Sequence, residues 1–306
     1  MDQCPAACST RRQLLKSVVA GGVAAAAANV PAQGQDEAAF ARKTATNGRS
    51  RVKQSVMAWC FSGVPTDELI AACAKMGLTG MEGISPEYYP QMKSQGLAVS
   101  LVSSHGFQRG PVNPANREFC VSKLRECIDL AVEWHCENVI TFTGMREQGI
   151  SDEQSQRNCV DCWREVIPYA EEKGVNLALE HLNSRDDSHP MKGHPGYFGD
   201  SIDRCVEMIR RVDSSRMKLL FDIYHVQIMQ GDVIRRFREY QDLISHVHTA
   251  GVPGRGELDE NQELNYPAII RAILETGYAG YITQEFIPTW EDPLASLKYG
   301  VEVCDV

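Results

Sequence analysis

The 306-residue sequence predicts an α/β protein, a single (β/α)8 TIM barrel preceded by a cleavable signal segment. Within residues 52–306, short runs rich in Val, Ile, Leu and Phe alternate with helical patterns, as expected for parallel strands covered on both faces. This stretch has the normal length of one such barrel. Carboxylate or imidazole groups end four of the runs, which is typical of a site at the C-terminal rim of a barrel.

Eight strands are expected from the apolar runs and the polar residues that flank them. Their predicted ranges are Val56–Phe61, Met81–Ile84, Ala98–Ser103, Asn138–Thr143, Asn176–His181, Lys218–Tyr224, Ser245–Thr249 and Tyr281–Phe286. Helical patterns between them favour a closed barrel over an open sheet. The second unit is the weakest, because residues 85–96 leave room for only a short helix.

Capping residues support the helices. The helix that starts at Thr66 is expected to use this residue as its N-cap and to end before Gly77, which suits the left-handed position after a helix. The helix that starts at Tyr266 has Pro267 in its first turn and Gly277 at its end, the usual asymmetry.

Residues 1–32 are similar to a twin-arginine export signal, and residues 33–51 are expected to form a loose polar linker. Arg11 and Arg12 precede an apolar run of about 14 residues, shorter than the ~20 that span a bilayer. A small-x-small pattern predicts cleavage after Ala32. We therefore expect a periplasmic or otherwise exported protein without a membrane association after cleavage. A disordered Ala-rich tail or an uncleaved anchor is the alternative interpretation.

The charge of the chain argues against a nucleic-acid partner. The formal net charge is −9, and loss of the signal removes a net +2 and leaves −11. An acidic chain binds nucleic acid poorly, because phosphate contacts need Lys and Arg. A small hydroxy-carbonyl or sugar substrate is the expected partner, and the sequence does not indicate the oligomeric state.

The eleven cysteines give neither a disulfide framework nor a zinc site. Cys159 and Cys162 form a CxxC pair on a helical stretch, without a second pair. Most others lie in apolar patterns, where a free Cys behaves as a small hydrophobe. Structural roles are therefore predicted, with an occasional disulfide left open.

Four residues that close predicted strands are interpreted as ligands of one divalent cation: Glu180, Asp222, His248 and Glu285. A charge at the end of a buried strand is costly unless it is paired or ligated. Three carboxylates and one imidazole suit a hard cation, so Mg²⁺ or Mn²⁺ is expected. Each residue alone could form a rim ion pair, but four at matching strand ends favour a metal site.

Glu180 and Glu285 are also the expected catalytic pair. If the cation binds a substrate carbonyl and the adjacent hydroxyl, a carboxylate can remove the proton next to the carbonyl and give an enediolate. Proton return to the other carbon isomerises the substrate, and return to the opposite face epimerises it. The residue pattern alone leaves both outcomes open.

Further side chains near the predicted rim are candidates for substrate binding. His225 lies where its ring could hydrogen-bond a substrate oxygen, or only its neighbours, and Arg255 in a Gly-rich loop could clamp a carboxylate or hydroxyl. His105 and Glu82 end strands at the level of the pocket, without a partner that can be named. His246 is expected to face away from the barrel interior and to be structural.

Several motifs make the chain similar to hydroxypyruvate isomerase-like proteins, which belong to the xylose isomerase-like TIM barrel superfamily. The matching segments are 178–183, 194–198, 221–227, 231–232, 250–255, 263–267, 277–280 and 284–288. The resemblance covers nearly all of residues 52–304 and is clearest from Glu180 to Pro288. It implies catalytic glutamates at Glu180 and Glu285 and a metal site completed by Asp222.

The predicted function is a metal-dependent isomerase that interconverts hydroxypyruvate and tartronate semialdehyde, or a related hydroxy-carbonyl compound. A ketose 3-epimerase or another sugar isomerase outside the cytoplasm is the alternative, because ketose 3-epimerases carry a His-x-His strand like residues 246–248. A non-catalytic metal- or sugar-binding barrel is a further alternative. A phosphodiesterase of the same superfamily is disfavoured by the acidic charge and the eight histidines.

Overall fold

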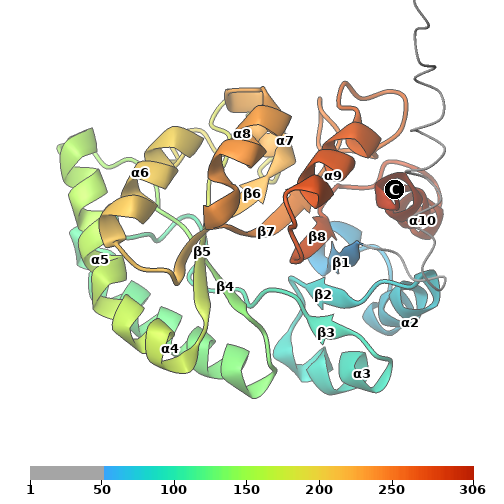
Figure 1. The fold of residues 1–306 in the computed structure, drawn as a ribbon, viewed down its shortest axis with the longest axis horizontal. Helices are drawn as coiled ribbons and strands as arrows, with labels where there is room; N and C mark the ends of the chain where they lie inside the picture. The colour runs from blue at the N-terminus through green and yellow to red at the C-terminus, as the bar shows by residue number, and fades with distance from the viewer. Residues whose placement is uncertain (1–51) are drawn as a thin grey trace, which may run out of the picture. The chain divides into compact units, whose positions relative to one another are not determined.

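The computed structural model describes residues 52–306, in which eight parallel strands form one curved sheet surrounded by helices (Figure 1). The strand order is β3-β2-β1-β8-β7-β6-β5-β4. A parallel bridge between Val102 and Val139 joins the segment after β3 to β4, the two ends of this order. The arrangement is consistent with the predicted TIM barrel. The predicted signal segment and linker lie outside the described residues.

The elements follow the expected alternation. The strands are β1 (Lys53–Met57), β2 (Gly80–Glu82), β3 (Ala98–Val99), β4 (Asn138–Thr141), β5 (Asn176–Glu180), β6 (Met217–Asp222), β7 (Ile244–Thr249) and β8 (Tyr281–Gln284). The α-helices are α2 (Thr66–Met76), α3 (Tyr89–Ser94), α4 (Arg117–Glu133), α5 (Asp152–Lys173), α6 (Ile202–Val212), α7 (Ile223–Met229), α8 (Val233–Tyr240), α9 (Tyr266–Glu275) and α10 (Pro293–Cys304).

All eight predicted strands exist, but their ends differ from the predicted ones. β6 stops at Asp222 because the carboxylate of this residue accepts hydrogen bonds from the backbone N–H groups of Tyr224, at 2.8 Å, and His225, at 3.3 Å. These bonds cap α7, so the helix begins where the strand was expected to continue. β1 begins earlier than predicted, because the exposed Lys53 pairs in the ladder before the four buried residues.

The predicted helix caps are partly correct. Gly77 ends α2 with φ +87°, as expected for a left-handed residue after a helix. Thr66 is the first helical residue and makes no cap, because Pro65 occupies the N-cap position. α9 has Pro267 in its first turn, and Asn265 caps it by accepting the N–H of Ala268.

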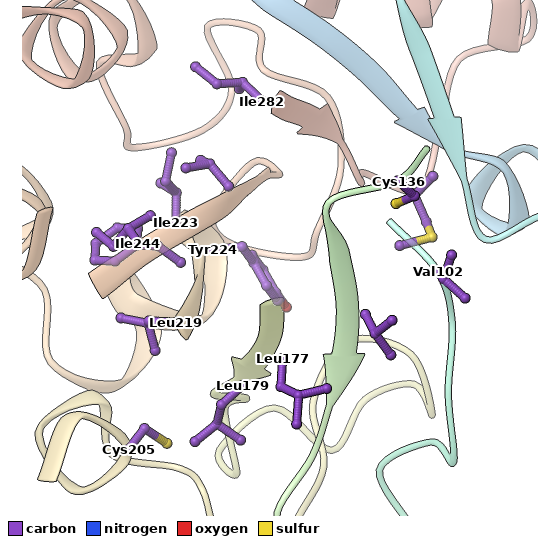
Figure 2. Close-up of a cluster of buried hydrophobic side chains, with 14 of the residues drawn as sticks. Val102, Cys136, Leu177, Leu179, Cys205, Leu219, Ile223, Tyr224, Ile244 and Ile282 are labelled. Carbon is purple, nitrogen blue, oxygen red and sulfur yellow. The ribbon is translucent and has the colours of Figure 1, made fainter. Parts of the chain in front are cut away.

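Side-chain alternation divides the apolar core into two layers. Leu177, Leu179 and Leu219 pack in the layer between sheet and helices, which Figure 2 shows in part. Ala178 and Leu220, one residue away, belong to a second cluster on the other face of the strands, inside the curved sheet. Residues two positions further along these strands share that inner face, so Glu180 and Asp222 reach the barrel interior.

The nine cysteines within residues 52–306 are all buried and free, in agreement with the predicted structural roles. In the same part of the chain, no helix combines the length and the apolar character needed to cross a bilayer.

Candidate metal and substrate site

Four predicted ligands meet at one rim of the sheet. Three lie at the ends of β5, β6 and β7 and one directly follows β8; they are Glu180, Asp222, His248 and Glu285. One ligand atom from each lies within 4.8 Å of the others, and all four residues are buried. Strand register contributes directly, because Asp222 pairs with His248 in the β6–β7 ladder. The fold therefore brings the complete predicted set together.

Two basic side chains neutralise part of the negative charge in this cluster. His248 Nδ1 lies 2.7 Å from Glu285 Oε2 and 3.2 Å from Glu180 Oε1. Arg255 Nη2 lies 2.6 Å from Glu285 Oε2. Burial acts to raise the pKa of Glu285, but Arg255 and His248 outweigh it and lower this pKa to about 2. Burial and the charge of Glu285 raise the pKa of Asp222 to about 7.

The donor set fits a hard divalent cation. Three buried carboxylates share one guanidinium and one imidazole, so the cluster can accept further positive charge. Carboxylate oxygens with one imidazole nitrogen are suitable ligands for Mg²⁺ or Mn²⁺. Glu180, Asp222, His248 and Glu285 are the residues that would hold the ion.

A buried asparagine orients the ring of His225. His225 Nδ1 accepts hydrogen bonds from the backbone N–H of Asn183, at 3.1 Å, and from its side-chain amide, at 2.7 Å. The neutral ring therefore carries its proton on Nε2, which lies 3.4 Å from Asp222 Oδ2. Burial and the charge of Arg255 hold the pKa of His225 well below its usual value. Asn183 lies in one of the matched motifs, but its contact with His225 could not be predicted from the residue pattern.

Arg255 is held rigidly at the wall of the site. Its guanidinium carbon lies 5.4 Å from the ring centroids of both Trp59 and Tyr224, and Nη1 donates to the carbonyl of Met191 at 2.6 Å. A backbone hydrogen bond of 2.8 Å joins the ends of the loop over 251–256. The Gly-rich loop is thus held in place around a buried arginine.

A cavity of about 190 Å³ opens beside the cluster. Its polar lining comes mainly from Glu180, Glu285, Arg255 and His194. Its apolar lining includes Leu101, Phe107, Ile140, Phe142, Leu182 and Met191. A larger cavity of about 510 Å³ lies where the strands begin, lined by Lys53, Asn138, Ile244 and Tyr281 among others. We place the site at the smaller cavity, because barrel enzymes use the C-terminal ends of their strands.

His105 lies beside this cavity and is not among its lining residues. Its Nδ1 contacts the carbonyl of Gly106 at 2.9 Å, and Nε2 contacts Thr141 Oγ1 at 3.0 Å. The ring forms a T-shaped contact with Phe142, with the ring centroids 6.2 Å apart. Both ring nitrogens of His105 therefore have protein partners, whereas Arg255 of the predicted substrate-binding set lines the cavity directly.

The expectation that His246 faces away from the interior is wrong. Residues two apart on a strand point to the same face, so His246 and His248 both turn inward. His246 Nε2 lies 2.8 Å from Glu82 Oε2, and His248 Nε2 lies 2.7 Å from Glu82 Oε1. No partner for Glu82 could be predicted from the sequence, and in the structure this residue bridges the two histidines.

Comparisons with known proteins agree with this architecture. A model of the xylose isomerase-like TIM barrel family matches residues 70–304. A 2-oxo-tetronate isomerase from Pectobacterium atrosepticum is 27% identical over 264 residues, which cover 78% of this chain and 96% of the relative. A Drosophila melanogaster protein with the provisional name hydroxypyruvate isomerase is 27% identical over 214 residues, or 68% of this chain and 78% of the relative.

Solved structures show the same fold. An AP endonuclease of family 2 from Brucella melitensis superposes with a TM-score of 0.69 at 23% identity, covering 82% of this chain and 96% of that one. An L-ribulose 3-epimerase superposes with a TM-score of 0.68 at 18% identity, covering 82% and 92%. The predicted resemblance to isomerases of this superfamily is confirmed, since the curated relatives carry isomerase names.

Proposed function

Because the chain belongs to the xylose isomerase-like TIM barrel family, we propose that it is a metal-dependent isomerase of a small hydroxy-carbonyl compound, with hydroxypyruvate and tartronate semialdehyde as the named pair. The observation that carries this proposal is the pair of buried glutamates, Glu180 and Glu285, which approach His248 Nδ1 from β5 and β8 and line one cavity. Two carboxylates beside a cation site are what proton removal and return require.

The chain's own residues supply the proton chemistry. When bound, Mg²⁺ or Mn²⁺ supplies Lewis acidity that makes the proton next to a substrate carbonyl easier to remove. One ionised glutamate takes this proton and the substrate becomes an enediolate, and the other glutamate, in its protonated form, delivers a proton to the neighbouring carbon. The hydroxyl proton of the first carbon moves to the former carbonyl oxygen, which balances the isomerisation. Arg255 lines the cavity and offers charge for a substrate carboxylate. His225 is not among the lining residues, and its Nε2–H faces Asp222 Oδ2 at 3.4 Å.

Two features bear on the substrate. The Pectobacterium relative spans almost its full length in the alignment, so 2-oxo-tetronate is the first related substrate to test. A ketose 3-epimerase is the second candidate function, favoured by the inward-facing pair His246 and His248 on one strand. Epimerisation needs the same two carboxylates and differs only in where the proton returns. A non-catalytic metal- or sugar-binding barrel would bind the ion and turn over none of these compounds.

One experiment separates these functions. Mn²⁺- or Mg²⁺-loaded protein is incubated in D₂O with hydroxypyruvate, 2-oxo-tetronates and ketoses, and the products are followed by NMR. Solvent deuterium at the carbon next to the carbonyl, together with a new isomer, identifies substrate and outcome at once. The matched control is Glu165→Gln, a change at an exposed glutamate on α5 that pairs with Arg117. Metal binding without exchange into any compound would contradict the isomerase proposal.

We also propose that residues 1–32 form a cleavable twin-arginine signal and that residues 33–51 link it to the barrel, so that the enzyme acts outside the cytoplasm. Support comes from the order of arginine pair, apolar run and small-x-small site in the sequence.

A further inference from the structure

Glu82 connects β2 to the metal-ligand strand β7 through the barrel interior. The strand order places β1 and β8 between these two strands, so the contact is made by side chains across the inner face of the sheet. Oε1 of Glu82 lies 2.7 Å from His248 Nε2. His248 Nδ1, the other ring nitrogen, faces Glu285 and Glu180. One imidazole therefore joins Glu82 to the candidate metal cluster.

The second carboxylate oxygen of Glu82 is anchored by three other groups. Oε2 accepts a hydrogen bond from Ser100 Oγ at 2.6 Å and one from Thr283 Oγ1 at 3.1 Å, and His246 Nε2 lies 2.8 Å away. Ser55 Oγ lies 2.6 Å from Thr283 Oγ1, and it donates there because the hydroxyl hydrogen of Thr283 points to Glu82. Glu82 and its partners are all buried, so the carboxylate has one fixed orientation.

A carboxylate only accepts hydrogen bonds, so Nε2 of His248 carries a proton and donates it to Glu82. Nδ1 also faces carboxylates in the metal-free protein, Glu285 at 2.7 Å and Glu180 at 3.2 Å, and it would give up its proton to bind a cation there. We propose that Glu82 is a positioning residue that directs the Nδ1 lone pair of His248 into the cation site. The inference rests on the proposed metal-dependent function and adds a residue to it. A partner of this kind fixes the tautomer and ring orientation of a ligating histidine and raises its basicity.

Glu82→Gln is a sharp test because the amide has one acceptor end and one donor end. Three donors surround the Oε2 position and one faces the Oε1 position, so the amide oxygen takes the Oε2 place. The NH₂ group then faces His248 Nε2, which must accept, and the proton moves to Nδ1, the nitrogen needed for the metal. We expect Mn²⁺ affinity, measured by calorimetry on metal-stripped protein, to fall about 10–100-fold.

A second readout follows the ring itself. In Mg²⁺-loaded protein, ¹H–¹⁵N NMR of the histidine side chains should show His248 protonated on Nε2 in the wild type and on Nδ1 in Glu82→Gln. The control is Glu257→Gln, which alters another buried carboxylate that holds Thr289 and Ser296 and does not contact the four ligands. This variant should keep wild-type Mn²⁺ affinity and the Nε2-protonated ring.

The outcomes are distinguishable. Wild-type protein that binds no Mn²⁺ would overturn the proposed function together with this inference. If Glu82→Gln binds Mn²⁺ as tightly as the wild type and keeps the same His248 tautomer, the inference alone is overturned. An equal loss of Mn²⁺ affinity in the control Glu257→Gln would also overturn it. If Glu82→Gln does not fold, Ser100→Ala tests the positioning role instead, because it removes one hydrogen-bond donor to Glu82 and leaves His248 unchanged. A smaller loss of Mn²⁺ affinity supports the positioning role, and an unchanged affinity refutes it.

Discussion

Arg255 Nη2 lies 2.6 Å from Glu285 Oε2, so a loop after β7 supplies the counter-charge for the carboxylate that follows β8. The same guanidinium nitrogen lies 3.6 Å from Asp222 Oδ2. Arg255 and the two carboxylates are almost completely buried. Removal of one member of such a group leaves an uncompensated charge, which costs more than the group contributes as a whole.

Arg255→Met should therefore destabilise the metal-free protein by about 3–5 kcal/mol. Chemical denaturation in EDTA at neutral pH measures this loss. Added Mn²⁺ should restore part of the stability, because the ion replaces the missing positive charge beside Glu285. An exposed arginine in a surface pair, Arg238 with Glu275, provides the control Arg238→Met, which should cost less than about 1 kcal/mol. Equal losses in the two variants would contradict the buried counter-ion role.

Asp222→Asn should lower Mn²⁺ affinity by at least about 10-fold while the fold survives. The amide keeps an oxygen that can cap α7, whereas the charged ligand is lost. Asp292→Asn is a matched control, because Asp292 caps α10 through Leu294 and Ala295 in the same way. Metal content after dialysis and the thermal midpoint are measured for both variants. Retention of wild-type metal content by Asp222→Asn would count against this ligand.

Glu180→Gln and Glu285→Gln should each reduce turnover by about 10²–10⁴-fold, because each removes a basic carboxylate and keeps its volume. Metal should be retained better than in Asp222→Asn if these glutamates act mainly in proton transfer. The variant that lacks the proton-removing residue should also lose solvent exchange into the substrate in D₂O. Near wild-type isomerisation by both metal-loaded variants would rule out the two-carboxylate mechanism.

His105 should make the protein less stable in mild acid. Burial lowers the pKa of its ring from the ordinary 6.5 to about 4, so the unfolded chain takes up the proton first. The stability from the neutral ring is complete above pH 6.5 and is lost as the pH falls towards 4, with a slope of up to about 1.4 kcal/mol per pH unit. Denaturation of wild type and His105→Leu at several pH values tests this. The difference in unfolding free energy between the two proteins should shrink as the pH falls. A difference that stays constant with pH would refute the predicted effect of His105.

The double substitution Arg11→Lys with Arg12→Lys should retain the precursor in the cytoplasm, since the export pathway reads the arginine pair. Cell fractionation with an antibody against the barrel measures the distribution. The control is Arg49→Lys with Arg51→Lys, two arginines beyond the predicted cleavage site. Unchanged export of the first variant would show that residues 1–32 are not such a signal.

The candidate ligands could be predicted because they depend on short-range patterns. A run such as residues 176–180 ends on a charge, and parallel strands deliver their C-terminal ends to one rim. Because side chains alternate between the two faces of a strand, Glu180 on β5 and Asp222 on β6 both point to the inner face of the sheet. No distant contact had to be known for this step, which explains why the four residues could be expected to lie close together.

Contacts between distant strands could not be predicted in the same way. Glu82 is 166 residues from His248, and their hydrogen bond depends on how far the sheet curves and how far a glutamate reaches. Asn183 is similar, because its place beneath His225 is set by the loop after β5. The end of β6 was missed because an aspartate can continue a strand or cap a helix, and the backbone of the following residues decides.

The two halves of the barrel contribute differently to the cavity. Every candidate ligand and Arg255 belong to β5–β8 or their loops, whereas one part of the apolar wall, formed by Leu101, Ile140 and Phe142, comes from β4 and the segments after β3 and β4. This part of the wall is therefore encoded in a different stretch of the chain from the candidate reactive groups. Under the proposed function, substitutions there would alter which compounds fit and leave the candidate proton-transfer residues unchanged, which makes these segments the natural target for redesigning substrate range.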